Sequence, residues 1–164
     1  MSNRKIVLRK EVPGNFVDLT HARVPKQRAV MKKIRQAGVC PFCPKYLKTY
    51  HSKPIVREGA HWVITENDYP YKGTRIHLLG IHKKHLISPT ELDPKSKVEM
   101  FDHLGWATKE YKIKGGTALM RFGDTRFTGG SVAHLHFHIF TGGTKKESNN
   151  KPINAKIGYH HAGK

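Results

Sequence analysis

The segment from Ser131 to Phe140 places His134, His136 and His138 at every second position, with apolar residues between them. Side chains of an extended strand alternate between its two faces, so the pattern predicts a strand with three imidazoles on one face and apolar residues in the core. Successive imidazoles are expected roughly 7 Å apart, which is twice the strand rise. Burying three titratable rings without a purpose has a desolvation cost. The pattern therefore indicates catalytic or metal-binding chemistry.

The rest of the chain predicts helices and strands in a mixed order. Helices are expected at 25–37 and 94–114, and strands at 55–57, 61–65, 75–82, 117–122 and 132–140, with further short strands at 6–8 and 153–157. The spacing of Val98, Phe101 and Leu104 predicts the buried face of the long helix, which Gly115 and Gly116 are expected to end. This order indicates an α+β fold with a mostly antiparallel five-stranded sheet, one long helix and a shorter N-terminal helix.

Basic residues are densest in the two ends of the chain. The net charge is +18, with ten basic and two acidic residues in 1–38 and five and one in 142–164. This division predicts a basic N-terminal extension with a short helix at 1–38, a central domain at 39–141, and a basic C-terminal tail with a short strand at 142–164. Such a charge attracts phosphate-bearing partners, either free nucleotides or nucleic acid. A merely solvated surface is the alternative interpretation.

No apolar run approaches the roughly 18 residues that a membrane span needs, and the first ten residues lack the apolar centre of a secretory signal. We therefore expect a soluble cytoplasmic protein that does not enter membranes. The two cysteines, Cys40 and Cys43, lie in one Cys-Pro-Phe-Cys motif. In such a chain this spacing indicates a metal site or a redox pair rather than a disulfide scaffold.

These features together resemble the histidine-triad (HIT) family, whose signature is His-x-His-x-His with apolar residues at x. The resemblance covers 39–140 in order: the cysteine knuckle, the strand ending at Asn67, the run His77 to His85, the long helix and the triad. It implies a HIT-like fold, a homodimer, and a nucleotide hydrolase or nucleotidyl transferase. The reaction would cleave at the α-phosphate of a nucleoside monophosphate derivative through a covalent nucleotidyl-histidine.

The resemblance also implies a role for each matched residue. The middle histidine, His136, corresponds to the nucleophile, and a neutral imidazole is a competent nucleophile near pH 7 because its unperturbed pKa is about 6.5. His77 corresponds to a histidine that supports the catalytic one. Backbone amides of the Gly129–Gly130 turn could stabilise phosphate oxygens. The candidate catalytic residues are His136, His138, Ser131 and His77, and the candidate substrate-binding residues are Asn67, Asp68, Gly130, Ser131, His136 and His138.

Three positions depart from the family pattern. Arg121 begins the loop before the triad where the family often has asparagine, Gly130 stands where glutamine is frequent, and His82 stands where proline is frequent. These departures leave the reaction class intact and the preferred leaving group open.

A structural zinc ion is expected from the resemblance to zinc-containing branches of the same superfamily. Its ligands would be Cys40, Cys43, His85 and His134, with His82 and His51 as competing third ligands. The cysteine spacing alone would fit a redox pair or two free thiols equally well. Zinc would tie the knuckle to the triad segment and would be structural rather than catalytic.

Three functions remain open at this stage. The first is the nucleotide hydrolase or transferase acting on dinucleoside polyphosphates, phosphoramidates or adenylates. The second is aprataxin-like processing of adenylated nucleic-acid ends, which the basic flanks favour modestly. The third is a non-catalytic, zinc-stabilised module that binds nucleic acid.

Overall fold

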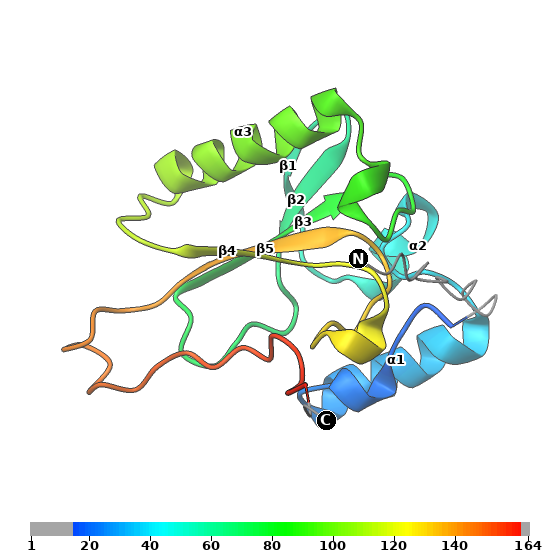
Figure 1. Cartoon of the computed structure of the whole chain (residues 1–164), viewed down its shortest axis with the longest axis horizontal. Helices are drawn as coiled ribbons and strands as arrows, with labels where there is room; N and C mark the ends of the chain where they lie inside the picture. The colour runs from blue at the N-terminus through cyan, green and yellow to red at the C-terminus, as the bar shows by residue number, and fades with distance from the viewer. Residues whose placement is uncertain (1–14, 162–164) are drawn as a thin grey trace, which may run out of the picture.

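A five-stranded antiparallel sheet forms the centre of the computed structural model, which describes residues 15–161 (Figure 1). The strands are β1 (Ile55–Glu58), β2 (Trp62–Glu66), β3 (Ile76–His82), β4 (Thr117–Arg121) and β5 (His136–Thr141), and the α-helices are α1 (Pro25–Ala37), α2 (Pro44–Tyr50) and α3 (Pro94–Glu110). The strand order is β1-β2-β3-β5-β4, and every neighbouring pair is antiparallel. The predicted α+β class and five-stranded sheet are confirmed.

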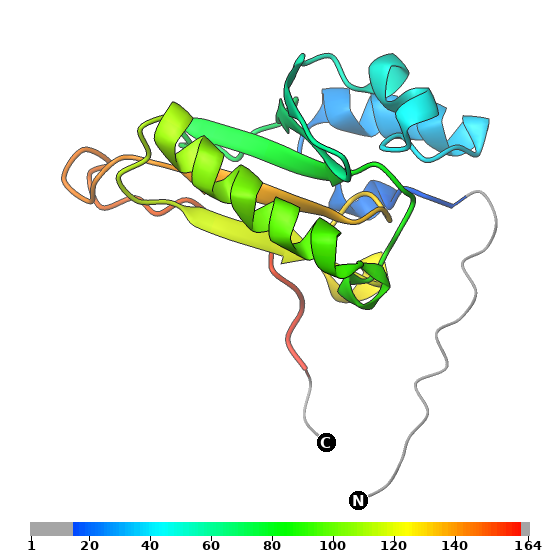
Figure 2. The ribbon, with the colours of Figure 1, turned by 90° about the horizontal axis from the view of Figure 1, so that it is seen from above.

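The two faces of the sheet carry different elements. The long helix α3 covers one face, and α1 and α2 lie at the other (Figures 1 and 2). The core under α3 contains the buried residues Trp62, Ile64, Leu78, Leu92, Ala107, Leu135, Phe137 and Ile139. Leu47 of α2 packs against Val63, Leu79 and Ile81 on the opposite face. Because alternate residues of β5 face opposite layers, the apolar residues of the triad segment enter the α3 core and leave the His136 and His138 rings on the other face.

The first helix is confirmed with the predicted bounds. Pro25 occupies its first turn, and Gly38 follows its end in the left-handed conformation with φ of 63°. This conformation costs glycine nothing because it has no Cβ. The second helix, α2, was not predicted. It has only seven residues, and its Pro44 also fits the turn that the knuckle was expected to form.

The long helix ends earlier than its pattern predicts. α3 stops at Glu110, and Lys112 takes a left-handed φ of 50°, so Gly115 and Gly116 lie beyond the end of the helix. The predicted buried face was wrong at Val98 and Phe101, which are 61% and 66% exposed, whereas Leu104 does pack on the core. The residues of α3 that are buried or pack on the core are Ser96, Met100, His103, Leu104, Trp106 and Ala107. Ser96 and His103 are polar, so an apolar periodicity did not find this face.

The triad strand begins later than predicted. β5 starts at His136 rather than at Val132 because the backbone before it pairs with other segments. The amide of Ala133 donates to Phe16, the amide of Leu135 donates to Leu86, and Val132 forms a single bridge with Val17. His134 therefore precedes the strand instead of belonging to it.

The predicted strand at 153–157 is absent from the described part of the chain, where residues 151–157 have no regular structure. A single bridge joins Thr128 to Gly158, and the side chains of Arg121 and His21 contact Lys156 and Tyr159 of the tail. The predicted strand at 6–8 lies outside the described residues. None of the helices among residues 15–161 combines the length and the hydropathy of a membrane-spanning segment.

Candidate functional site

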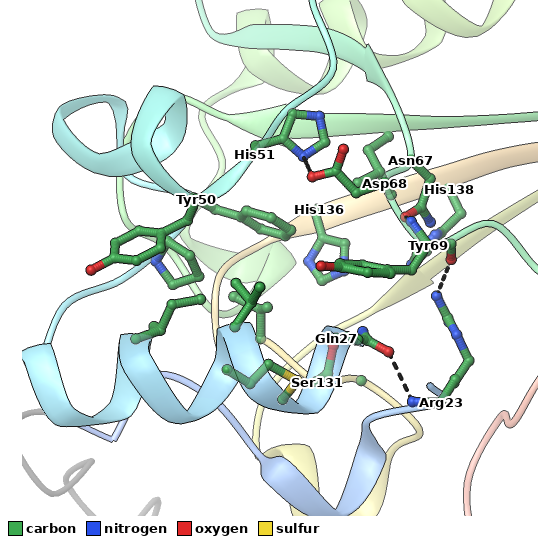
Figure 3. Close-up of a pocket in the computed structure, with 18 of the residues that line it drawn as sticks. Arg23, Gln27, Tyr50, His51, Asn67, Asp68, Tyr69, Ser131, His136 and His138 are labelled. Atoms are coloured by element: carbon green, nitrogen blue, oxygen red, sulfur yellow. Dashed lines mark hydrogen bonds and ion pairs between the residues drawn. The ribbon is translucent and has the colours of Figure 1, made fainter. Parts of the chain in front are cut away.

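A pocket lies on the face of the sheet opposite α3. His136 and His138 line it from β5, and Asn67 and Asp68 line it from the segment after β2. Helix α1 forms another wall through Gln27 and neighbouring apolar residues, as Figure 3 shows. The predicted basic extension thus contributes directly to the pocket that holds His136 and His138.

His136 is only 5% exposed, yet its ring lines the pocket. Its Nδ1 lies 2.6 Å from the backbone oxygen of His134, and a carbonyl oxygen accepts only, so Nδ1 carries the proton and donates. The lone pair of the neutral ring is then on Nε2. Burial, and secondarily the Arg121 guanidinium, lowers the pKa of His136 to about 4 despite that hydrogen bond. The ring is therefore neutral and nucleophilic at pH 7.

A chain of hydrogen bonds fixes the proton on His138. The backbone amide of Tyr71 donates to Nδ1 of His77 at 3.1 Å, so neutral His77 carries its proton on Nε2. That nitrogen lies 2.9 Å from Nδ1 of His138, which accepts, and the proton of His138 is left on Nε2. Burial lowers the pKa of His77 to about 4 and holds the pKa of His138 well below its usual value, so both rings stay neutral. His138 thus presents an N–H donor at the pocket.

The two catalytic candidates stand closer together than their strand positions predict. The ring centroids of His136 and His138 are 5.1 Å apart, rather than roughly 7 Å, and the rings meet edge to face with planes inclined by 65°. One group bound between them could therefore contact both rings.

The other substrate-binding candidates also lie at the pocket. Asn67 accepts from the amide of Tyr69 through Oδ1, and this bond holds its side chain. Its Nδ2 lies 3.0 Å from Nε2 of His77. The Tyr71 amide makes that nitrogen a donor, so this contact joins two donors and is not a hydrogen bond. Asp68 accepts from the amide and the hydroxyl of Ser52, and one of its oxygens lies 3.2 Å from Nδ1 of His51 (Figure 3). Both side chains are held rigidly before any ligand arrives.

The loop before the triad contributes Gly130 and Ser131. The amide of Gly130 already donates to the Thr128 hydroxyl at 3.0 Å, and its carbonyl lies 2.6 Å from Nδ1 of His21. The Gly130 amide already has an acceptor. Of these two residues, Ser131 is therefore the one that can offer a donor to a ligand, through its hydroxyl.

Arg121 is a site residue that sequence reasoning did not select. It is 8% exposed at the end of β4, and its register partner on β5 is His136. Its Nη1 lies 3.3 Å from Nε2 of His138, and Nε and Nη2 donate to the backbone oxygen of Lys156. One feature of the sequence could have pointed to it: Arg121 begins the loop before the triad, where the HIT family often has asparagine.

The four predicted metal ligands converge in space. One donor atom from each of Cys40, Cys43, His85 and His134 lies within 4.8 Å of all the others. The distance from Nδ1 of His134 is 3.3 Å to Sγ of Cys40 and 3.2 Å to Nδ1 of His85. A tetrahedral zinc site with bonds of 2.0–2.3 Å separates its ligands by about 3.3–3.8 Å, so the set fits zinc.

The chemistry of two ligands supports the same interpretation. Nε2 of His134 donates to the backbone oxygen of His82 at 2.7 Å, which leaves the lone pair of Nδ1 facing the cluster. Burial raises the pKa of the Cys40 thiol to about 12, so a cation is needed to hold this sulfur as a thiolate near pH 7. Phe42, between the two cysteines, packs edge to face on His136 at 5.1 Å. The knuckle thereby supports the candidate nucleophile.

The competing ligands lie elsewhere. The ring of His82 contacts the hydroxyl of Ser96 at 3.0 Å, and His51 contacts Thr65 and Asp68. Neither belongs to the cluster of donor atoms.

Comparison with known proteins places this arrangement in a known fold. A histidine triad protein from Clostridium difficile superposes with a TM-score of 0.51 at 24% identity, covering 64% of this chain and 91% of that one. A hypothetical protein from Leishmania major gives a TM-score of 0.55 at 23% identity, covering 77% and 85%. A Hit-like protein gives 0.50 at 24% identity, covering 60% and 95%. Neither the protein-family models nor the curated proteins compared with this chain match it.

The chain has the fold of histidine triad proteins. On that fold it carries the complete triad, with His136 and His138 in a pocket and His134 in a cluster of two cysteines and two histidines.

Proposed function

We propose that this protein is a nucleotide hydrolase or nucleotidyl transferase that acts at the α-phosphate of a nucleoside monophosphate derivative. The observation that carries the proposal is the proton arrangement of two rings at one pocket. His136 offers an unprotonated Nε2, and His138 offers an N–H donor whose ring is 5.1 Å away. A nucleophile beside a donor for phosphate oxygens is the arrangement that phosphoryl substitution needs.

In the reaction, Nε2 of His136 attacks the α-phosphorus while the bond from phosphorus to the leaving group breaks and its electron pair departs with that group. The histidine is then joined to the nucleotide through a phosphorus–nitrogen bond, and Nδ1–H remains bonded to the His134 oxygen. Water, or another acceptor, attacks phosphorus in the second step. This step breaks the phosphorus–nitrogen bond, returns the electron pair to Nε2, passes the proton of the attacking oxygen to solvent and releases the nucleoside monophosphate or its transferred product.

The pocket supports the nucleoside part as well. Its apolar wall between α1 and the knuckle suits a nucleobase and consists of Val30, Met31, Ile34, Pro41, Phe42 and Leu79. Asn67 and Asp68 lie at the same pocket with oxygen atoms suited to ribose hydroxyls. Ser131 supplies a hydroxyl for the phosphate or the leaving group. Zinc at the cysteine and histidine cluster would hold the knuckle in place, and no chemical step uses it.

The test is to trap the intermediate. The protein is incubated with a panel of adenylated compounds, quenched, and measured by intact mass and peptide mass spectrometry. A nucleotidyl group on His136 is expected, and His136→Ala should lack it while the exposed control His160→Ala keeps it. A wild-type protein that turns over these compounds with no adduct on His136 contradicts the proposed mechanism.

A second candidate function rests on the outer face of α1. Its inner residues line the pocket, while the exposed side carries Lys26, Arg28, Lys32, Lys33 and Arg35, and the helix has no acidic residue. A nucleic-acid backbone lying on this face would bring an adenylated end close to the pocket. The alternative substrate is therefore an adenylated nucleic-acid end, bound through its phosphates.

Deleting residues 1–38 would be a poor test because Gln27, Met31 and Ile34 belong to the pocket. A triple variant, Lys32→Gln, Lys33→Gln and Arg35→Gln, leaves the inner face intact. It should bind adenylated duplex more weakly and with a shallower salt dependence. The slope of the logarithm of the binding constant against the logarithm of the salt concentration should fall by about one for each lost phosphate contact. The matched control changes three exposed lysines, Lys109 in the last turn of α3 and Lys112 and Lys114 just after it. Equal binding by the two triple variants contradicts this candidate.

The homodimer and the cytoplasmic location stay predictions from the sequence. Analytical ultracentrifugation of the full chain and fractionation of cells that contain it are the measurements that check them.

A further inference from the structure

Arg121 holds a positive charge inside the pocket without an opposing carboxylate. Among residues 15–161 no Asp or Glu oxygen lies within 4 Å of its guanidinium, and its protein acceptor is the carbonyl oxygen of Lys156. Asp68, the acid at this pocket, contacts Ser52 and His51 and makes no ion pair with Arg121. A buried charge without a partner is costly, and proteins keep such charges where a ligand neutralises them.

The contact between Arg121 and His138 joins two donors. Nη1 and Nε2 are 3.3 Å apart, but the hydrogen bonds through His77 leave the proton of His138 on this same Nε2. Two N–H groups that point to one place have no acceptor between them in the described structure. An anionic oxygen accepts from both, which a water or a neutral amine does less well.

A second guanidinium lies at the rim of the same pocket. The Arg23 guanidinium stands over the ring of buried Tyr71 at 4.5 Å, and that of Arg121 lies 6.0 Å from the same ring. Arg23 is exposed, donates to the backbone oxygen of Tyr69, and has no ion-pair partner among the described residues (Figure 3). The pocket thus presents two cations, one buried and one at its opening.

The number of charges distinguishes between classes of leaving group. The α-phosphate of an anhydride or a phosphoramidate carries one negative charge, whereas two guanidiniums match a substrate with at least two. We propose that Arg121, with His138 and the rim residue Arg23, forms an anion subsite that selects nucleotides whose leaving group is itself a phosphate over those whose leaving group is a neutral amine. The selectivity rests on the function proposed above and deepens it.

Two measurements test the subsite. The first is the ratio of kcat/KM for a dinucleoside polyphosphate to that for a nucleoside phosphoramidate of an uncharged amine. The ratio is expected to favour the polyphosphate and to fall about 10- to 100-fold in Arg121→Gln, because each lost contact is a charge-assisted hydrogen bond. Arg23→Gln should lower it in the same direction. Arg75→Gln removes an equal charge from an exposed residue outside the pocket and should leave the ratio unchanged.

The second measurement is calorimetric binding of inorganic pyrophosphate, which needs no turnover. Wild type should bind it, Arg121→Gln should bind it about 10- to 100-fold more weakly, and Arg121→Lys, which keeps the charge but loses the fork, should fall between them. Thermal melts of each variant verify that the fold is kept. Equal ratios and equal pyrophosphate affinities in wild type and Arg121→Gln overturn the subsite. Arginine-dependent pyrophosphate binding without turnover of either substrate keeps the subsite and overturns the nucleotide-transfer function.

Discussion

Nε2 of His77 lies 2.9 Å from Nδ1 of His138, and this bond decides which nitrogen of His138 faces the pocket as a donor. His77 comes from β3 and His138 from β5, on strands that pair directly with each other. Tyr71 completes the arrangement because its amide donates to the other nitrogen of His77. The proton of His138 is therefore placed by groups that do not themselves react.

Replacing His77 tests this positioning role. His77→Ala should lower kcat/KM about 10- to 100-fold, because His138 loses the donor that fixes its tautomer. His77→Gln, whose amide can still donate, should recover a large part of the loss. Steady-state kinetics of the three proteins check the prediction. A Gln variant as impaired as the Ala variant, with both fully folded, would show that the hydrogen bond does not matter.

The metal cluster predicts one zinc ion per chain. Cys40→Ser or His85→Ala should abolish zinc binding, lower the melting temperature and reduce activity, because Phe42 then loses its fixed position against the ring of His136. Elemental analysis and thermal melts measure the first two effects. His51→Ala is the informative control because His51 is outside the cluster, and zinc content should be unchanged. Loss of zinc in this control variant would contradict the assigned ligands.

Stability is predicted to fall as the pH drops below about 6.5. Burial lowers the pKa of His77 to about 4, so between pH 6.5 and 4 the unfolded chain binds a proton that the folded protein refuses. The contribution of His77 to the free energy of unfolding is fully present above pH 6.5. It decreases as the pH falls from 6.5 to 4, by at most about 1.4 kcal/mol per pH unit for one histidine. Burial also lowers the pKa values of His51, His82, His103 and His138.

Urea unfolding at several pH values measures this effect. His77→Gln should show a shallower decline between pH 6.5 and 4 than wild type, and the exposed control His160→Gln should match wild type. A His77→Gln profile with the full wild-type slope would contradict the assignment.

Two glycines are predicted to respond oppositely to alanine. A Cβ at Gly80 in β3 would stand 2.1 Å from the ring of Phe137, which packs against Trp62 and has little freedom to move. Gly80→Ala should therefore lower the free energy of unfolding by about 1–3 kcal/mol. Gly105 lies inside α3 with nothing within 4 Å, so Gly105→Ala should raise it by about 0.5–1 kcal/mol. Urea unfolding of both variants checks the signs, and a stabilised Gly80→Ala would contradict the packing described here.

The sequence by itself determined the features that depend on short-range periodicity and spacing. Alternation along 131–140 predicted which residues enter the core, and Pro25 with Gly38 marked both ends of α1. Local sequence could not predict which face of α3 is buried, because the buried positions include the polar residues Ser96 and His103. Which residues are buried there depends on how the helix packs on the sheet. Local sequence also placed the start of β5 too early, since the backbone around Ala133 pairs with Phe16 rather than with a neighbouring strand.

Only the tertiary structure decided how the predicted residues act together. The zinc ligands could be chosen from sequence through resemblance, but their convergence depends on contacts between segments more than forty residues apart. Arg121 became a site residue because sheet register places it opposite His136, and Arg23 because α1 folds over the pocket. The charge and the proton position of a buried imidazole ring depend on its desolvation and on the groups that lie beside it in space. Those groups come from distant parts of the chain and cannot be identified from the order of residues alone.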